Sequence, residues 1–198
     1  MTKTLLLAAV AATTVVLPGL AQAQRVPAAV IAVVDSNRAA RECNACRTAW
    51  SNLQSQAQAL QTRQQTLDTQ LRPEAQSLEA AVRALGNKQP DAALQQRVTA
   101  FEQRRQQAAQ EIGRGQQNLQ SIQANIVQQI NARLAPAVNQ VMTARGANLV
   151  LDTDARLASA PALDVTNDVI AALNTSLPSI TVAPLPQQQQ QQQAPQGR

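Results

Sequence analysis

The residues best suited to chemistry are two cysteines three positions apart, Cys43 and Cys46. A C-x-x-C spacing serves thiol–disulfide exchange when it opens a helix beside a βαβ unit of the thioredoxin type, and no such unit is predicted here. The chain contains no His, so one chain cannot supply the usual four ligands of a zinc site. The favoured interpretation is a structural disulfide, within one chain or between chains. Redox catalysis, and a zinc site that pools the cysteines of three chains, are the alternatives.

Paired carboxylates at Asp152 and Asp154 are the second candidate. On a strand, residues two positions apart share one face, where two carboxylates could hold a metal ion or exchange protons. The chain has no His and no Tyr, and no nucleophile stands in a suitable setting, so we favour the end of a strand followed by a turn. We therefore expect no enzyme activity, no metal and no cofactor.

Positive charge is concentrated in the middle of the chain. Between residues 38 and 145, thirteen basic residues stand against seven acidic ones, an excess of six, while the flanking segments lean acidic. Such an asymmetry concerns partners rather than the fold. The alternative is a solvated helix surface whose charge is incidental. Seven basic residues are our candidate contacts for an acidic partner: Arg63, Arg72, Arg83, Lys88, Arg97, Arg104 and Arg114.

The scarcity of aromatic residues narrows the classes of function. The 198 residues include one Trp, one Phe and no Tyr, whereas aromatic side chains dominate the burial energy of ordinary cores. A composition rich in Ala, Leu, Val and Gln indicates long helices with thin apolar seams. The lack of stacking side chains also argues against binding to nucleic acid.

The first 23 residues have the form of a cleavable signal peptide. Lys3 supplies a positive start, residues 4–17 are uncharged and mostly apolar, and a small-x-small site ends at Ala23. The apolar run is shorter than the about 20 residues that a bilayer-spanning helix needs. We expect cleavage after Ala23 and export of a soluble protein to a bacterial periplasm, away from nucleic acid.

Two short apolar runs, at residues 28–34 and 148–152, flank a long helical region and are typical of buried strands. Between them, apolar residues recur at steps of three and four over residues 36–85 and again over 91–145, as in a coiled-coil seam. Gly86 and Pro90 interrupt this pattern, and Asp91 is a plausible cap for the second helix. We predict an antiparallel hairpin whose arms, about 50 residues each, are roughly 75 Å long.

Four residues within the arms are expected hinge points. Pro73 and Pro136 each remove a backbone hydrogen bond from a helix. Gly113 and Gly115 are expected to loosen the second helix, and Gly115 occupies a seam position. Such hinges would let the arms adapt to partners of different size.

The remaining segments complete the predicted organisation. A short helix over residues 164–174, capped by Asp164 or Thr166, follows the second strand, and the Pro- and Gln-rich residues 178–198 are expected to be disordered. Two strands and one short helix cannot form a stable core alone, so the base should oligomerise. The predicted fold class is α+β, mostly α, with long antiparallel coiled-coil arms that project from a small β-containing body. The domains are a signal peptide (1–23), a body strand (24–37), a helical hairpin arm (38–145, tip 86–91), a body strand with the C-terminal helix (146–177) and a tail (178–198).

This order of elements resembles the Skp/OmpH family of periplasmic chaperones over residues 30–174. The resemblance rests on the strand at residues 31–35, the strand at 148–152 and the segment at 164–170, in this order after a signal peptide. It implies a jellyfish-shaped homotrimer, in which a small β-barrel body carries three arms around a cavity. It also implies an ATP-independent holdase that binds unfolded outer-membrane proteins and performs no chemistry.

Other partners and functions stay open at the level of the sequence. Lipopolysaccharide or another anionic lipid is a second anionic partner available in the periplasm, although no local motif for it is present. A structural coiled-coil protein of the cell envelope would have the same arms without a client. A thiol oxidoreductase would use Cys43 and Cys46. The single Lys in the arms, the Gln-rich tail and the cysteine pair depart from what is typical of the family.

Overall fold

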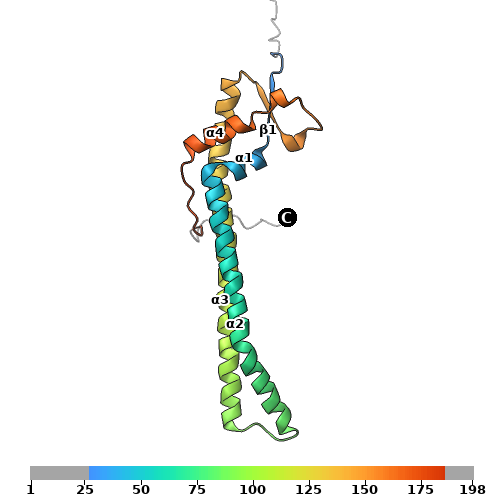
Figure 1. Cartoon of the computed structure of the whole chain (residues 1–198), viewed down its shortest axis with the longest axis vertical. Coiled ribbons are helices and arrows are strands. Elements are labelled where there is room, and N and C mark those ends of the chain that lie inside the picture. The colour runs from blue at the N-terminus through green and yellow to red at the C-terminus, as the bar shows by residue number, and fades with distance from the viewer. Residues whose placement is uncertain (1–26, 186–198) are drawn as a thin grey trace, which may run out of the picture.

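The described part of the chain is a long helical hairpin that projects from a small mixed base (Figure 1). The structure is a computed structural model and describes residues 27–185, so the expected signal peptide lies outside the described residues. Within residues 27–185, no helix combines the length and the apolar character that crossing a membrane requires. The predicted fold class is confirmed by this arrangement. The elements in chain order are β1 (Ile31–Val34), α1 (Ser36–Glu42), α2 (Asn44–Leu85), α3 (Ala92–Ala144), β2 (Leu149–Asp152), two 3-10 turns (Thr153–Ala155 and Pro161–Leu163) and α4 (Thr166–Ser176).

The base is built on a parallel pair of short strands. Ile31 of β1 lies opposite Leu149 of β2, and the whole hairpin forms the connection between the two strands. The other edge of β1 is covered because the Val165 N–H donates to the Val33 carbonyl at 2.8 Å. In the described residues β2 has no second partner strand, so its outer edge is open.

The core lies where this base meets the root of the arms. The seam of α3 supplies a buried stripe at the positions that the apolar periodicity predicts. Against this stripe pack small residues of α1 and α2 and the apolar face of α4. Members of the cluster include Ala39, Cys43, Cys46, Ala49, Ile122, Ile126, Ile130, Ala137, Val141, Val169 and Leu173.

The first long helix is not continuous, and this corrects the prediction of one helix over residues 36–85. α1 ends at Glu42 and α2 begins at Asn44, because Cys43 has an extended backbone with ψ of 147°. Downstream, α2 contains Pro73, and α2 and α3 diverge toward the tip (Figure 1). The Asp91 carboxylate accepts the Leu94 N–H at 2.8 Å and caps α3, as predicted.

The expectation that Gly115 loosens the seam is wrong. The side chain of Leu60 in α2 fills the space beside Gly115, and a Cβ atom added there would stand 2.5 Å from the Leu60 Cδ1. The absence of a side chain therefore permits close packing of the two helices at this point. At Gly113, by contrast, nothing lies within 4 Å of the position of an added Cβ.

Two further corrections concern the C-terminal region. α4 begins with Val165 as its N-cap, while the Asp164 carboxylate accepts the Thr166 N–H at 2.8 Å, so neither expected residue is the cap itself. Residues 178–185, expected to be disordered, run back along α3 instead. Leu185 is only 5% exposed there. The rest of the expected tail lies outside the described residues.

Candidate functional site

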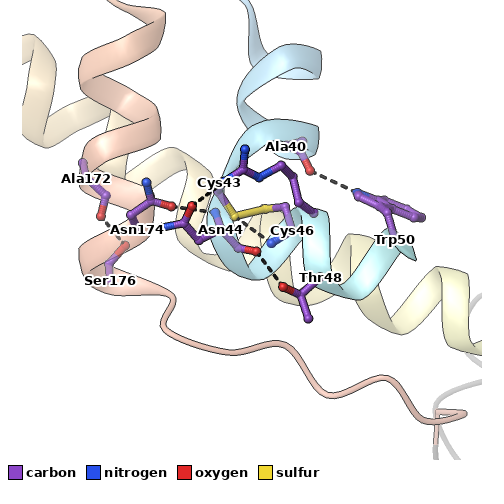
Figure 2. Close-up of a disulfide and its surroundings, with 10 residues drawn as sticks. Ala40, Cys43, Asn44, Cys46, Thr48, Trp50, Ala172, Asn174 and Ser176 are labelled. Carbon is purple, nitrogen blue, oxygen red and sulfur yellow. Dashed lines mark hydrogen bonds between the residues drawn. A yellow bond between two sulfur atoms is a disulfide. The ribbon is translucent and has the colours of Figure 1, made fainter. Parts of the chain in front are cut away.

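The cysteine pair lies at the junction of α1 and α2 (Figure 2). Cys43 and Cys46 form a disulfide within the chain. The Cys43 Sγ accepts a hydrogen bond from the Cys46 N–H at 3.1 Å, and Asn174 of α4 accepts the Asn44 N–H at 2.7 Å through its Oδ1. Two backbone donors in the first turn of α2 are thereby satisfied, and α4 is tied to the root of the arm.

Burial determines what this pair can do. Thiol–disulfide exchange requires an incoming thiolate to reach a sulfur atom, and both Cys43 and Cys46 have no exposed surface. Their surroundings include the small apolar residues Ala39, Ala45 and Ala49. These observations favour a structural role over thiol–disulfide catalysis. Among residues 27–185, no three His, Cys, Asp or Glu side chains come together as metal ligands would.

The paired carboxylates end β2, as the sequence indicated. Asp152 is the last residue of the strand, and its Oδ1 accepts the Asp154 N–H at 3.2 Å. Burial raises the pKa of Asp152, but hydrogen bonds, led by that from Ser36, outweigh it, so the pKa lies below its ordinary value. The Asp154 carboxylate instead accepts a hydrogen bond from the Asn37 amide. Both carboxylates therefore have local structural partners.

The seven basic residues chosen from the sequence all lie on the exposed surface of the arms, but they fall into two groups. Four of them have a partner within the hairpin. Three form ion pairs and the fourth, Arg97, donates to the Ser77 Oγ at 3.0 Å. The ion pairs are Arg63–Glu111 at 2.6 Å, Arg83–Glu79 at 3.1 Å and Arg104–Glu74 at 2.5 Å.

The Arg63–Glu111 pair joins α2 to α3. Its side-chain hydrogen bond lowers the pKa of Glu111 below the ordinary value and raises that of Arg63, so both groups stay ionised. The pair is exposed, and ion pairs of this kind contribute little stability. The charge of Arg63 is nevertheless largely compensated within the arm.

The second group comprises Arg72, Lys88 and Arg114, which form no ion pair in the described part of the chain, although the charge of Arg114 helps to lower the pKa of Glu111. Arg72 lies on α2 one residue before Pro73, Lys88 lies at the tip, and Arg114 lies on α3. The charges of Arg72 and Lys88 are free to act on a partner, whereas that of Arg114 is partly balanced by Glu111. Pairing of this kind depends on which residues the hairpin register brings together, and the sequence reasoning did not resolve it.

The arm also has two grooves, one near the tip and one at the root. Near the tip, where α2 leaves α3, a groove of about 590 Å³ is lined by Leu78, Val82, Val98 and Phe101. Val82 is 51% exposed and Val98 37%, so the apolar seam is open to solvent there. The groove exists because the two helices diverge. A hinge at Pro73 is predicted from the sequence, but the groove is not.

The second groove, of about 750 Å³, lies at the root of the arm and was missed by the sequence reasoning. Trp50 and Val127 form its apolar part, and Arg41 and Arg47 line its edge. Neither arginine forms an ion pair within residues 27–185. The only tryptophan of the sequence, four residues after the C-x-x-C pair, was the available signal for this surface.

The comparisons with known proteins agree with this architecture. The family described as outer membrane protein (OmpH-like) matches residues 30–173, most of the chain. The chain belongs to the OmpH-like family. Among solved structures, an OmpH-like protein of Caulobacter crescentus CB15 that is assigned as an outer membrane chaperone has a TM-score of 0.65 at 20% identity, and the match covers 84% of this chain and 98% of that one. None of the curated proteins compared with the sequence matches it.

Membership of the OmpH-like family confirms the resemblance that the sequence suggested and supports a chaperone role. The structural neighbour shows that the fold, long helical arms on a small base, is shared at low identity.

Proposed function

We propose that this chain is an ATP-independent periplasmic holdase, whose arms sequester unfolded outer-membrane proteins between the three copies of a homotrimer. The observation that carries the proposal is the design of the arms. They extend far beyond the core, they carry exposed cations that form no ion pair within the described residues, and near the tip their apolar seam is open to solvent. A surface of this kind can hold many sequences weakly, and it needs no catalytic group.

The trimer is proposed from the base. Leu149 and Ile31 are 42% and 37% exposed, and the outer edge of β2 has no partner in the described residues. Open strand edges beside exposed apolar side chains promote aggregation, and pairing with other copies of the chain covers them. Pooling the strands of three copies would close the edges and leave the arms projecting from one side.

The arms would capture clients in two steps. Arg72, Lys88 and Arg114 attract acidic unfolded chains at long range, because a concentration of positive charge raises the rate of encounter. The tip and root grooves then hold apolar side chains through short-range contacts. The phosphates of lipopolysaccharide suit the same free cations and are a second candidate ligand.

The experiment is an aggregation assay on the full mature chain. An unfolded outer-membrane β-barrel protein is diluted from urea with and without the chaperone, and turbidity is followed at several salt concentrations. A holdase keeps the client soluble without ATP. Turbidity that is unchanged at every ratio of chaperone to client would instead favour a structural coiled-coil protein of the envelope.

Charge variants test the capture step. Replacing Arg72, Lys88 and Arg114 together by Gln removes three positive charges that form no ion pair, and we expect about tenfold slower association with the client at low salt. The matched control replaces Arg83 and its ion-pair partner Glu79 by Gln, which leaves the net charge unchanged. Equal association rates for the two variants would contradict the electrostatic step.

A further inference from the structure

The segment that follows α4 is bound to the arm through its backbone. This segment, residues 178–185 and hereafter the strap, runs beside the root of the arm in dark red (Figure 1). Three polar residues of α3, hereafter the ladder, contact it: Ser121, Asn125 and Gln129.

The hydrogen bonds that join the ladder to residues 178–185 all end on main-chain atoms of the strap, and Gln129 also donates to the Oδ1 atom of Asn125 within the ladder. Gln129 accepts the Thr181 N–H at 2.9 Å through Oε1 and donates to the Thr181 carbonyl at 3.0 Å through Nε2. Asn125 donates to the Ala183 carbonyl at 2.9 Å. Ser121 accepts the Leu185 N–H at 2.8 Å. The ladder therefore binds backbone groups, which are common to nearly all polypeptides.

The spacing of these contacts has a geometric basis. The ladder residues are four positions apart on α3, which places them about 6 Å apart along the helix axis. The bonded strap residues are two positions apart, and two residues of extended chain cover about 6.6 Å. The two repeats match closely enough for alternate residues of any extended chain, running antiparallel to α3, to meet successive rungs.

Apolar side chains alternate with the bonded residues at the start of the strap, while at its end the bonded residue Leu185 is itself buried. Ile180 and Val182, between and beside the bonded residues, are half-buried against the core cluster, and Leu185 is buried. A chain that binds here needs free N–H groups at the positions of Thr181 and Leu185, a carbonyl group at the position of Ala183, and aliphatic side chains for this surface. Strands of membrane β-barrels alternate apolar and polar residues with this period of two.

We propose that the ladder is a binding site for extended polypeptide, that the strap fills it in the resting protein, and that a strand-like segment of a client displaces the strap. The proposal rests on the proposed holdase function and specifies one of its binding sites. The strap then acts as an internal competitor, which lowers the apparent affinity for clients until displacement occurs.

The test uses full-length variants that release the strap with the ladder intact or broken. Leu185→Asp places a charge at the buried end of the strap and should free it. Its matched control is Leu157→Asp, because Leu157 is fully exposed. The probe is a labelled peptide with the strap sequence Pro-Ser-Ile-Thr-Val-Ala-Pro-Leu, and its binding is followed by fluorescence anisotropy.

We expect Leu185→Asp to bind the peptide about tenfold more tightly than the unaltered chain or the Leu157→Asp control, because the internal competitor is lost. Adding Gln129→Ala to Leu185→Asp should abolish this gain, since two backbone contacts disappear. Adding Gln128→Ala instead should leave the gain unchanged, because this exposed neighbour takes part in none of the hydrogen bonds that join the ladder to the strap. An unfolded β-barrel protein should displace the bound peptide.

Two results would overturn the proposal: equal peptide binding by all variants, or a bound peptide that no client displaces although the chain keeps that client soluble. In the second case the strap only stabilises the fold and does not compete with clients. A chain that binds the peptide but leaves clients to precipitate would contradict the holdase function itself. If Leu185→Asp loses helical signal in circular dichroism, Thr181→Pro is the second releasing variant, because it removes the N–H that Gln129 accepts.

Discussion

Two glycines of α3 should respond differently to replacement by Ala, and the difference in stability tests the packing of the arms. Gly113 and Gly115 both lie within α3, where Gly is less favourable than Ala by about 0.8–1.0 kcal/mol. At Gly113 an added methyl group meets no atom within 4 Å. Gly113→Ala should therefore stabilise the chain by nearly that full amount.

Gly115→Ala has the same gain in helix propensity but must displace Leu60. Three atoms of the Leu60 side chain lie 2.5, 3.1 and 3.4 Å from the position of the new Cβ. Moving this side chain out of its rotamer costs about 0.5–1.5 kcal/mol, and a shift of the two helices costs about 1–3 kcal/mol. Set against the gain in helix propensity, the net effect of Gly115→Ala should lie between a gain of about 0.5 kcal/mol and a loss of about 2 kcal/mol.

Urea unfolding followed by circular dichroism measures this difference, and amide hydrogen exchange in α3 detects local opening of the arm. In thermal unfolding followed by the same signal, we expect the melting temperature of Gly113→Ala to exceed that of Gly115→Ala by at least about 1–2 °C. In the Leu60→Ala background, Gly115→Ala should cost less than in the unaltered chain, because the obstructing atoms are gone. Equal stabilisation by both glycine replacements would refute the placement of Leu60 beside Gly115 and with it the register of the hairpin.

Four further outcomes follow from the base and the arm. Replacing Cys43 and Cys46 by Ala should cost about 2 kcal/mol of unfolding free energy in urea, the value for closing so short a loop; equal urea midpoints for the oxidised and reduced protein would contradict this. Hydrogen bonds from Thr166 lower the pKa of Asp164 below its ordinary value of 3.8. The ionised carboxylate therefore stabilises the folded chain above pH 3.8, and this contribution is lost as the pH falls through the lower pKa of the folded state. Asp164→Asn should therefore flatten the acid-unfolding curve, and parallel curves would exclude this role. Asn174→Ala removes the acceptor at the start of α2 and should destabilise the chain by about 1 kcal/mol in the same urea assay, whereas an unchanged midpoint would mean that water replaces it. Pro73→Ala should straighten α2 and narrow the range of barrel sizes held in the aggregation assay, and an unchanged range would show that the open tip is not used.

Local patterns were enough to predict most of the architecture. The periodicity of apolar residues placed the buried seam of α3, including Ile126 and Ile130, and the breaker cluster placed the tip with its cap at Asp91. These features depend on neighbours within one or two helical turns, which the sequence displays directly.

The features that the sequence did not predict depend on distant contacts. The break at Cys43 is stabilised by a hydrogen bond from the Asn44 N–H to Asn174. Asn174 is far away in the chain, so the residues around Cys43 do not indicate this contact. The strap has a Pro-rich composition typical of disorder, and the ladder residues look like ordinary solvent-facing polar residues until the fold brings them together. Likewise, Arg63 was selected as a free charge, whereas the hairpin register pairs it with Glu111.

The most direct test of the holdase function is the mass of the complex by light scattering on the mature chain, alone and after mixing with a urea-diluted outer-membrane β-barrel protein. The account predicts a trimer alone and, with the client, a soluble species whose mass equals one trimer plus bound client. A monomer or dimer, or a trimer that leaves the client to precipitate, would contradict it and would point to a structural coiled coil.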